Sequence, residues 1–227
     1  MTEESLTTAE LAGLEEAVGR ALAAGDPSLL TVLGFGELSV ALGWPTDQPR
    51  LVCKRLPPFT VAQLTRYEQV MAHYLEELSV RGVGVVDTSL MSLERNDGRR
   101  TAYLVQSLMP SESLGHNVLA AAAPDPDHPF LGALASTLEA VSVRLSVDAQ
   151  VTNFSWDGTS VTLLDVGTPL VWDGSGAFQF DMTPFLVMVP APRLKALQRV
   201  ERAWQTRVRR RPYEFFIHST FGGGQTY

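Results

Sequence analysis

The apolar residues of the chain change their spacing at Met109-Pro110, and this change constrains the fold more than any other feature of the sequence. Before it, short apolar or alternating runs predict strands, whereas after it spacings of three and four residues mostly predict helices. The turn signal Asn96-Asp97-Gly98 is typical of an antiparallel hairpin. The sequence therefore predicts an α+β, bilobal protein, with an antiparallel sheet in residues 1–109 and a mainly helical lobe in residues 110–220.

The first lobe is expected to contain two helices and five strands. Its predicted elements are the helices Thr8–Ala24 and Val61–Leu78 and the strands Leu30–Leu33, Leu38–Leu42, Leu51–Arg55, Val83–Leu93 and Thr101–Met109. The second lobe has predicted helices at Leu131–Leu145 and Leu194–Arg209, and a hairpin that joins Asn153–Trp156 to Val161–Leu164 through Asp157-Gly158. Residues 221–227 contain three consecutive glycines and are expected to form a flexible tail.

Composition excludes several classes of protein. The formal net charge of −7 argues against a nucleic-acid or anionic-membrane binder, since such proteins usually carry a basic surplus. The only cysteine is Cys53, so no disulfide framework or cysteine zinc site is expected. No apolar run is long enough to span a bilayer, and the acidic, polar start is unlike a signal peptide. We therefore expect a cytoplasmic protein. The basic run at 207–211 suits the end of a helix, and an anionic substrate or partner is the alternative.

Two glycines stand between the first two predicted strands. Gly34 and Gly36 would let the backbone approach a phosphate closely and point its N–H groups at it. An ordinary hairpin turn explains the same residues equally simply.

A lysine near the end of the third predicted strand is a second candidate. Lys54 would point to the same side as Val52 and Leu56, on a mostly apolar face where an ammonium group needs a counter-charge. Glu68 lies along the inward row of the following helix and is the expected partner, with Glu76 as a weaker one. A solvated lysine and a surface glutamate remain the alternative.

The most informative residues are Asp148, Asn153 and Asp165. We expect a helix to end just before Asp148, the predicted hairpin to begin at Asn153, and Asp165 to stand at the exit of the hairpin. The tight turn would then bring Asn153 and Asp165 together, and their oxygens are ligands suited to Mg²⁺. Asp148 would lie close by, able to accept a proton or orient a hydroxyl. Turn chemistry alone also favours Asp and Asn in loops.

These parts follow one another in a recognisable order: a glycine hairpin, V-x-K on the next strand, a helix with Glu68, two strands, a helix, D-x-x-x-x-N and D-x-G. In this order the chain resembles the protein-kinase-like superfamily, and more closely its bacterial aminoglycoside- and choline-phosphotransferase-like branch. The resemblance covers roughly residues 29–169. Ser146 stands where such proteins usually have a histidine, and only about 60 residues follow Gly167, so the helical lobe is expected to be abbreviated.

The resemblance implies a role for each candidate. Gly34 and Gly36 would cover the phosphates of ATP, and Lys54, held by Glu68, would pair with the α- and β-phosphates. Asp148 would be the catalytic base, and Asn153 and Asp165 would hold Mg²⁺. The hinge that receives adenine through its backbone would consist of four consecutive residues: Val105, Gln106, Ser107 and Leu108.

We therefore expect an ATP-dependent phosphotransferase that acts on a hydroxyl of a small molecule or of a peptide from the same pathway. The alternative is a pseudokinase-type nucleotide-binding or scaffolding module without phosphotransfer, which the short second lobe favours. A protein partner that completes this lobe is a further expectation. The third class considered is a structural α+β protein in which the ordered motifs are coincidental.

Overall fold

The structure is a computed structural model that describes residues 6–35, 39–122, 127–141 and 145–171. These residues form two compact units. Unit 1 contains the described residues up to 68 together with 87–108, and unit 2 contains 69–86 and those from 109 to 171. The predicted helix Leu194–Arg209, the tail and the basic run lie outside the described residues. Within the described part, no helix is long and apolar enough to cross a membrane.

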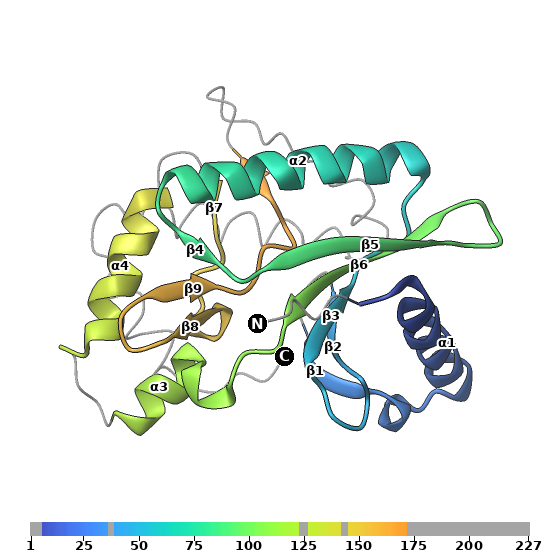
Figure 1. Cartoon of the computed structure of the whole chain (residues 1–227), viewed down its shortest axis with the longest axis horizontal. Helices are drawn as coiled ribbons and strands as arrows, with labels where there is room; N and C mark the ends of the chain where they lie inside the picture. Colours follow the sequence, from blue (N-terminus) through green and yellow to red (C-terminus); the bar gives the residue numbers. More distant parts are fainter. Residues whose placement is uncertain (1–5, 36–38, 123–126, 142–144, 172–227) are drawn as a thin grey trace, which may run out of the picture. The chain divides into compact units, whose positions relative to one another are not determined.

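Unit 1 is built on a five-stranded antiparallel sheet (Figure 1). Its strands, in the order in which they pair, are β1 (Thr31–Phe35), β2 (Val40–Trp44), β3 (Leu51–Arg55), β6 (Arg100–Ser107) and β5 (Thr88–Glu94). The hairpin between β5 and β6 turns through Gly98, which has a φ of 74° that favours glycine. The five-stranded antiparallel sheet predicted from the sequence is confirmed.

Four of the five strands predicted for the first lobe differ from the observed ones, and β6 does so by beginning one residue earlier and ending two residues earlier than expected. The run Val83–Leu93 forms two strands, because the short β4 (Gly84–Val85) pairs in parallel with β9 of unit 2 while β5 joins the sheet of unit 1. Strands β1 and β2 begin one and two residues later than expected. A register shift between Val32 and Gly34 accompanies this change, so that Gly34 pairs with Ala41 inside the sheet rather than in the turn.

Helix α1 (Thr8–Ala24) has the predicted bounds because both ends carry local signals. Thr7 and Glu10 form a capping box in which each side chain accepts a hydrogen bond from the backbone of the other. At the other end Gly25 adopts a left-handed conformation with a φ of 65° and closes the helix.

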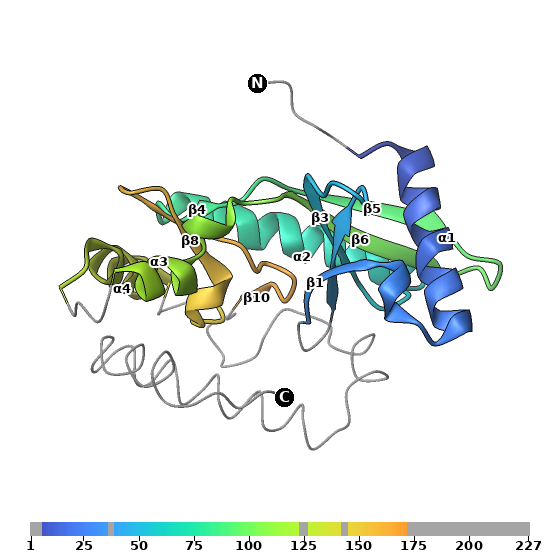
Figure 2. The same cartoon turned by 90° about the horizontal axis from the view of Figure 1, so that it is seen from below.

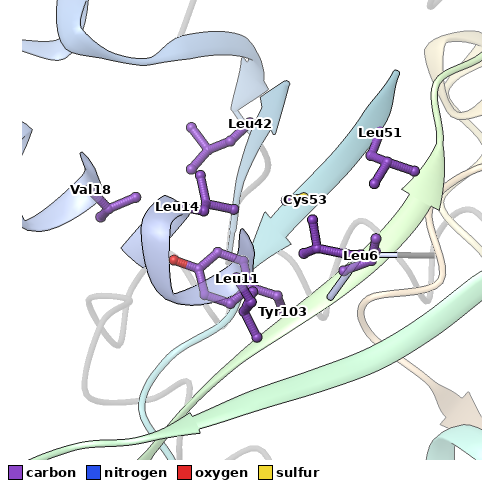
Figure 3. Packing of buried hydrophobic residues seen from close by; sticks show 9 residues of the cluster. Leu6, Leu11, Leu14, Val18, Leu42, Leu51, Cys53 and Tyr103 are labelled. Carbon is purple, nitrogen blue, oxygen red and sulfur yellow. The ribbon is translucent and has the colours of Figure 1, made fainter. Parts of the chain in front are cut away.

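The apolar side of α1 covers one face of the sheet of unit 1 (Figure 2). Leu11 and Leu14 of the helix point toward Leu42, Cys53 and Tyr103 of the strands (Figure 3). Because successive side chains of a strand point to opposite faces, the neighbours of Cys53 and Tyr103 along β3 and β6 lie on the other face. This places Val52, Lys54, Leu104 and Gln106 on the face of the sheet opposite α1.

A polar cluster also joins α1 to the sheet. The Nε and Nη2 atoms of Arg55 donate to the two carboxylate oxygens of Glu15 at 2.9 and 2.7 Å, and the hydroxyl of Tyr103 donates to the same carboxylate. Thr101 lies at the margin of the cluster, with its hydroxyl 3.5 Å from Glu15. Strand β3 is therefore tied to α1 by charge as well as by apolar packing.

Helix α2 (Val61–Val80) extends two residues beyond its predicted end. Its buried side chains recur at three- and four-residue steps and are Leu64, Tyr67, Val70, Met71, Tyr74 and Leu78. Within unit 1, the ring of Tyr67 packs against Phe59 with the ring centroids 5.4 Å apart.

Unit 2 combines short strands with helices. Its described elements from residue 109 onward are α3 (Gly115–Ala121), α4 (Pro129–Val141), β7 (Leu145–Ser146), β8 (Phe154–Trp156), β9 (Val161–Leu163) and β10 (Leu170–Val171), with a 3-10 turn, η3, at Val151–Asn153. The strands form a three-stranded sheet in the order β4-β9-β8 and a pair β10-β7. Together with the sheet and helices of unit 1, this arrangement confirms the predicted α+β class.

Candidate functional site

The loop around Asp148 lies between β7 and η3 in unit 2. Val147 and Ala149 of this loop and Val151 at the start of η3 are buried, whereas Asp148 keeps contact with solvent. The backbone N–H of Gln150 donates to the carboxylate of Asp148 at 3.2 Å. The predicted helix before this loop is observed as α4 up to Val141, and Leu145, its expected last residue, belongs to the two-residue strand β7 instead.

The hairpin of β8 and β9 separates the other two candidates, Asn153 and Asp165, along the chain. Asn153 is the last residue of η3, and its carbonyl oxygen accepts a hydrogen bond of 2.8 Å from the backbone N–H of Leu164. Asp165 follows directly, with its carboxylate 3.3 Å from the N–H of Gly167. The side-chain amide of Asn153 donates to the backbone carbonyl of Asp148 at 3.3 Å. Hydrogen bonds therefore link Asn153 to the backbone of Asp148 and to that of Leu164, the residue before Asp165.

The surroundings of Asp148 affect the ionisation of its carboxyl group. Protein atoms around Asp148 withdraw part of its hydration, and this desolvation raises the pKa of its carboxyl group above the ordinary value. The backbone N–H of Gln150 opposes the increase, while the charge of Asp165 adds to it. A carboxylate with a raised pKa holds a proton more readily than an ordinary aspartate, which suits a general base.

The cluster offers few but suitable ligands for a cation. No group of three or more His, Cys, Asp and Glu side chains in the described residues is arranged to hold a metal ion. Mg²⁺ does not need such a group, since it usually keeps several waters and binds through one or two carboxylates and the phosphates of a substrate. The amide oxygen of Asn153 and the carboxylate of Asp165 are donors of this kind.

Helix α3, which the sequence did not reveal, supports the turn that carries Asn153. A Cβ atom on Gly115 would stand 2.5 Å from the carbonyl oxygen of Val151 and 2.7 Å from the ring of Phe130. The helix can therefore begin this close to η3 only with glycine at its first position. A bridge between Leu114 and Ser155 adds backbone pairing to β8. A single glycine after a leucine carries no spacing signal, so sequence reasoning had no means of finding this contact.

The remaining candidates lie in unit 1. Lys54 is half-buried on the sheet face opposite α1, where its backbone pairs with Ala41 and Leu104. It shares this face with Val52, as predicted. Gly34 lies inside β1, and Gly36 falls outside the described residues.

The expectation that Glu68 lies on the inward side of α2 is wrong. Its side chain is exposed, because Tyr67 lies near the middle of the buried stripe of α2 and a helix turns by about 100° per residue, which places Glu68 outside the stripe. Glu76 is exposed as well. The ion pair between Lys54 and Glu68 stays a prediction.

The four residues expected to form a hinge belong largely to a strand. Strand β6 ends at Ser107, and Val105 is buried among the residues that contact α1. The backbone N–H of Leu108 donates to the carbonyl oxygen of Arg50 at 2.9 Å and so is not available to a nucleotide base. Gln106 is buried, and its side-chain Nε2 donates to the hydroxyl of Thr88 at 2.9 Å. Sequence reasoning assigned Gln106 a backbone role only and missed this side chain.

Comparison with protein families identifies the family of the chain. Residues 13–204 match the model of a family described as "Family of unknown function (DUF6206)", and the chain belongs to this family. No curated protein matches the sequence.

Some solved structures are similar to the chain at low identity. The MAP kinase LmaMPK10 from Leishmania major is 15% identical, with 67% of this chain and 49% of that chain covered and a TM-score of 0.36. WbdD in complex with the kinase inhibitor LY294002 is 18% identical, with 83% and 44% covered and a TM-score of 0.34. A second structure of WbdD, described as a bifunctional kinase-methyltransferase, is 17% identical, with 81% and 42% covered and a TM-score of 0.34. The chain spans less than half the length of these structures, and likeness at this level assigns no activity.

Proposed function

We propose that the chain is a phosphotransferase that uses ATP and Mg²⁺ and acts on a hydroxyl of a small molecule or a peptide. The observation that carries this proposal is the cluster of Asp148, Asn153 and Asp165 in unit 2, where a carboxylate with a raised pKa stands beside two suitable Mg²⁺ ligands. The resemblance to the aminoglycoside- and choline-phosphotransferase-like branch supports a small-molecule acceptor.

In the proposed reaction, the acceptor oxygen bonds to the γ-phosphorus of ATP while the bond from that phosphorus to the β–γ bridging oxygen breaks. ADP leaves with the electron pair, and the hydroxyl proton passes to Asp148. Asn153 and Asp165 would hold Mg²⁺, which supplies positive charge against the phosphates. In unit 1, Lys54 would bind the α- and β-phosphates, with Glu68 as its partner, and Gly34 and Gly36 would cover them.

A binding module without phosphotransfer is the second candidate, and one observation favours it. Glu68, the expected partner of Lys54, is exposed. Phosphotransfer in protein kinases requires an ion pair between the strand lysine and a helix glutamate, so an exposed Glu68 favours a module that binds nucleotide without efficient transfer.

Three variants separate these proposals. ATP with Mg²⁺ should raise the melting temperature of the wild type by mass action, and Asp165→Asn should remove the Mg²⁺-dependent part of the increase. Asp148→Asn should leave nucleotide affinity nearly unchanged and slow ADP formation by about 10²–10⁴-fold. The exposed Glu16→Gln on α1 is the matched control and should change neither measurement.

Asp148→Asn has a second expected effect, on stability without ligand. Because the folded-state pKa of Asp148 is raised, its contribution to stability is present at acidic pH and is lost as the pH rises through that pKa. The ligand-free variant should therefore melt at a higher temperature than the wild type at neutral pH. If the wild type shows no shift with ATP and Mg²⁺, both nucleotide proposals fail. If it binds ATP and Asp148→Asn does not alter ADP formation, the binding module is the correct function.

A further inference from the structure

Helix α4 of unit 2 has a histidine at its N-cap position. His128 directly precedes Pro129, the first residue of the helix, and its carbonyl oxygen accepts a hydrogen bond of 2.9 Å from the backbone N–H of Leu131. Its Nδ1 atom accepts a second hydrogen bond, of 3.3 Å, from the backbone N–H of Phe130. Because Pro129 has no N–H, these two bonds satisfy the first two N–H groups of the helix.

The imidazole of His128 can accept this hydrogen bond only while it is neutral. A backbone N–H can only donate, so Nδ1 presents its lone pair and the proton of the neutral ring lies on Nε2. Protonation would add a proton to Nδ1 and set a second donor against the N–H of Phe130. It would also place a positive charge at the positive end of the helix dipole. Histidine is the side chain whose charge ordinarily changes between about pH 5 and 8.

The N–H of Phe130 has no easy access to water once the cap is lost. Phe130 is fully buried, so an N–H without an acceptor is costly at this position. Its ring packs against Trp156 of β8, with the ring centroids 6.0 Å apart. The same ring lies against Gly115 of α3, which in turn lies against the carbonyl oxygen of Val151 in η3. Figure 1 shows α4 beside β8 and β9 within unit 2. A shift of Phe130 that hydrates its N–H therefore disturbs the support of the turn that carries Asn153.

Few ionisable side chains belong to the described elements packed against the start of α4. Strands β8 and β9 and the turn η3 contain none, and Asp157 stands in the hairpin turn beyond β8. The exposed Asp127 precedes His128 by one residue, and Glu139 lies about three turns further along α4. Helix α3 contributes the half-buried His116. His116 is thus the other described residue at this junction whose charge can change near neutral pH, and an experiment must separate the two histidines.

We propose that His128 is a pH-sensitive cap whose protonation loosens the first turn of α4 and, through Phe130, the junction of α3 with η3. The inference goes beyond the proposed function, because it makes the turn that carries Asn153 depend on the charge of a residue outside the candidate site. At neutral pH the capped helix holds the junction in place. At mildly acidic pH the uncapped first turn opens and the turn at η3 loses part of its support.

Amide hydrogen exchange of the ligand-free chain, measured by NMR for each residue and corrected for the intrinsic effect of pH, tests the inference. In the wild type, the protection of the N–H groups of Phe130 and Leu131 should fall about 5- to 30-fold from pH 7.5 to pH 5.5, the effect of losing a helix cap. His128→Asn supplies a cap that cannot be protonated, so its protection should be the same at both pH values. His128→Ala should show the low protection at both.

A second amide reports on the junction. The N–H of Asn153 donates to the carbonyl oxygen of Gln150 at 2.9 Å within η3. Its protection should fall with pH in the wild type, by less than that of Phe130, and should stay constant in His128→Asn. A fall at Phe130 with no change at Asn153 overturns the proposed effect on η3.

The matched control is His116→Gln, which should keep the pH dependence of the wild type. Equal protection at both pH values in the wild type, or a pH dependence that persists in His128→Asn, overturns the inference. A pH dependence that disappears in His116→Gln overturns it as well, because His116 would then be the group that titrates. If His128→Ala does not fold, the wild type and His128→Asn decide. None of these measurements uses a nucleotide, so this inference and the proposed function can fail separately.

Discussion

Replacing Glu15 by glutamine measures how much the stability of unit 1 depends on the cluster between α1 and the sheet. The carboxylate of Glu15 accepts two hydrogen bonds from Arg55 and one from Tyr103. The side chains of Arg55 and Glu15 are only 20% and 27% exposed. In Glu15→Gln the shape is kept, but a cation on β3 loses the anion that faces it.

The expected cost lies between two known limits. Exposed ion pairs contribute roughly 0–1 kcal/mol, whereas removing one partner of a fully buried pair costs about 3–5 kcal/mol. For a pair that is mostly but not fully buried we expect a loss of about 2–3 kcal/mol in the free energy of unfolding. A chain of this size loses about 2–4 °C in melting temperature per kcal/mol, so the decrease should be roughly 4–12 °C.

The pH dependence of the free energy of unfolding gives an independent check of the role of Glu15. Burial opposes the ionisation of Glu15, but the hydrogen bonds from Arg55 and Tyr103 outweigh it, and the pKa of Glu15 is lowered from its ordinary value of 4.5. A lowered folded-state pKa stabilises the protein above the unfolded value, and this stability is lost as the pH falls through the folded value. The difference between wild type and Glu15→Gln should therefore be full near pH 7 and shrink below pH 4.5.

The neighbouring Glu16 supplies the control. Its side chain is exposed on the same helix, so Glu16→Gln should change the free energy of unfolding by less than about 0.5 kcal/mol. Calorimetry or circular dichroism against temperature, from pH 3 to 8, measures both variants. The reasoning is refuted if Glu15→Gln melts within 2 °C of Glu16→Gln, or if its deficit is as large at pH 3 as at pH 7.

Two further predictions concern packing. Gly115→Ala should lower the free energy of unfolding by about 1–3 kcal/mol, since its Cβ would overlap the carbonyl oxygen of Val151. Gly19→Ala, which has open space around it in α1, should raise the free energy of unfolding by about 0.5–1 kcal/mol. Melting temperatures that change in the same direction in both variants would contradict this. Cys53 is fully buried, and burial raises the pKa of its thiol to about 12, so a thiol reagent at pH 8 should modify it only after denaturation. Modification of the native protein at the rate of a free thiol would show that the core around β3 opens.

Local signals explain what the sequence could predict. The bounds of α1 follow from Thr7, Glu10 and Gly25, which lie at its two ends. The turns at Gly98 and Gly158 adopt positive φ, which Asp-Gly sequences favour. The hydrogen bond between Asn153 and Leu164 follows from a signal of the same kind, because the tight turn at Gly158 joins β8 to β9.

Long-range pairing explains what was missed. The break between β4 and β5 arises because β4 pairs with β9, far along the chain. The ion pair of Glu15 and Arg55 joins residues 40 positions apart, and no periodic pattern announces it. Glu68 shows a different limit. The apolar stripe of α2 was predicted, but spacing alone does not decide whether a residue at the edge of the stripe is buried, and the side chain of Glu68 is exposed.

The side chains of β3 point alternately to two faces of the sheet, one that packs against α1 and one that carries the proposed phosphate-binding lysine. Cys53 and Arg55 point to the face that holds α1, while Val52 and Lys54 point to the face that carries Gln106. Variants on the two faces should therefore have separable effects. Glu15→Gln should lower the melting temperature and leave the affinity for ATP unchanged, because it removes no group on the face of Lys54. Lys54→Gln should weaken ATP binding even when the difference in melting temperature is taken into account, because it removes the proposed phosphate contact. If Glu15→Gln instead weakened ATP binding as strongly as Lys54→Gln, the two faces would be coupled through the strand, and assigning phosphate binding to one side chain would be wrong.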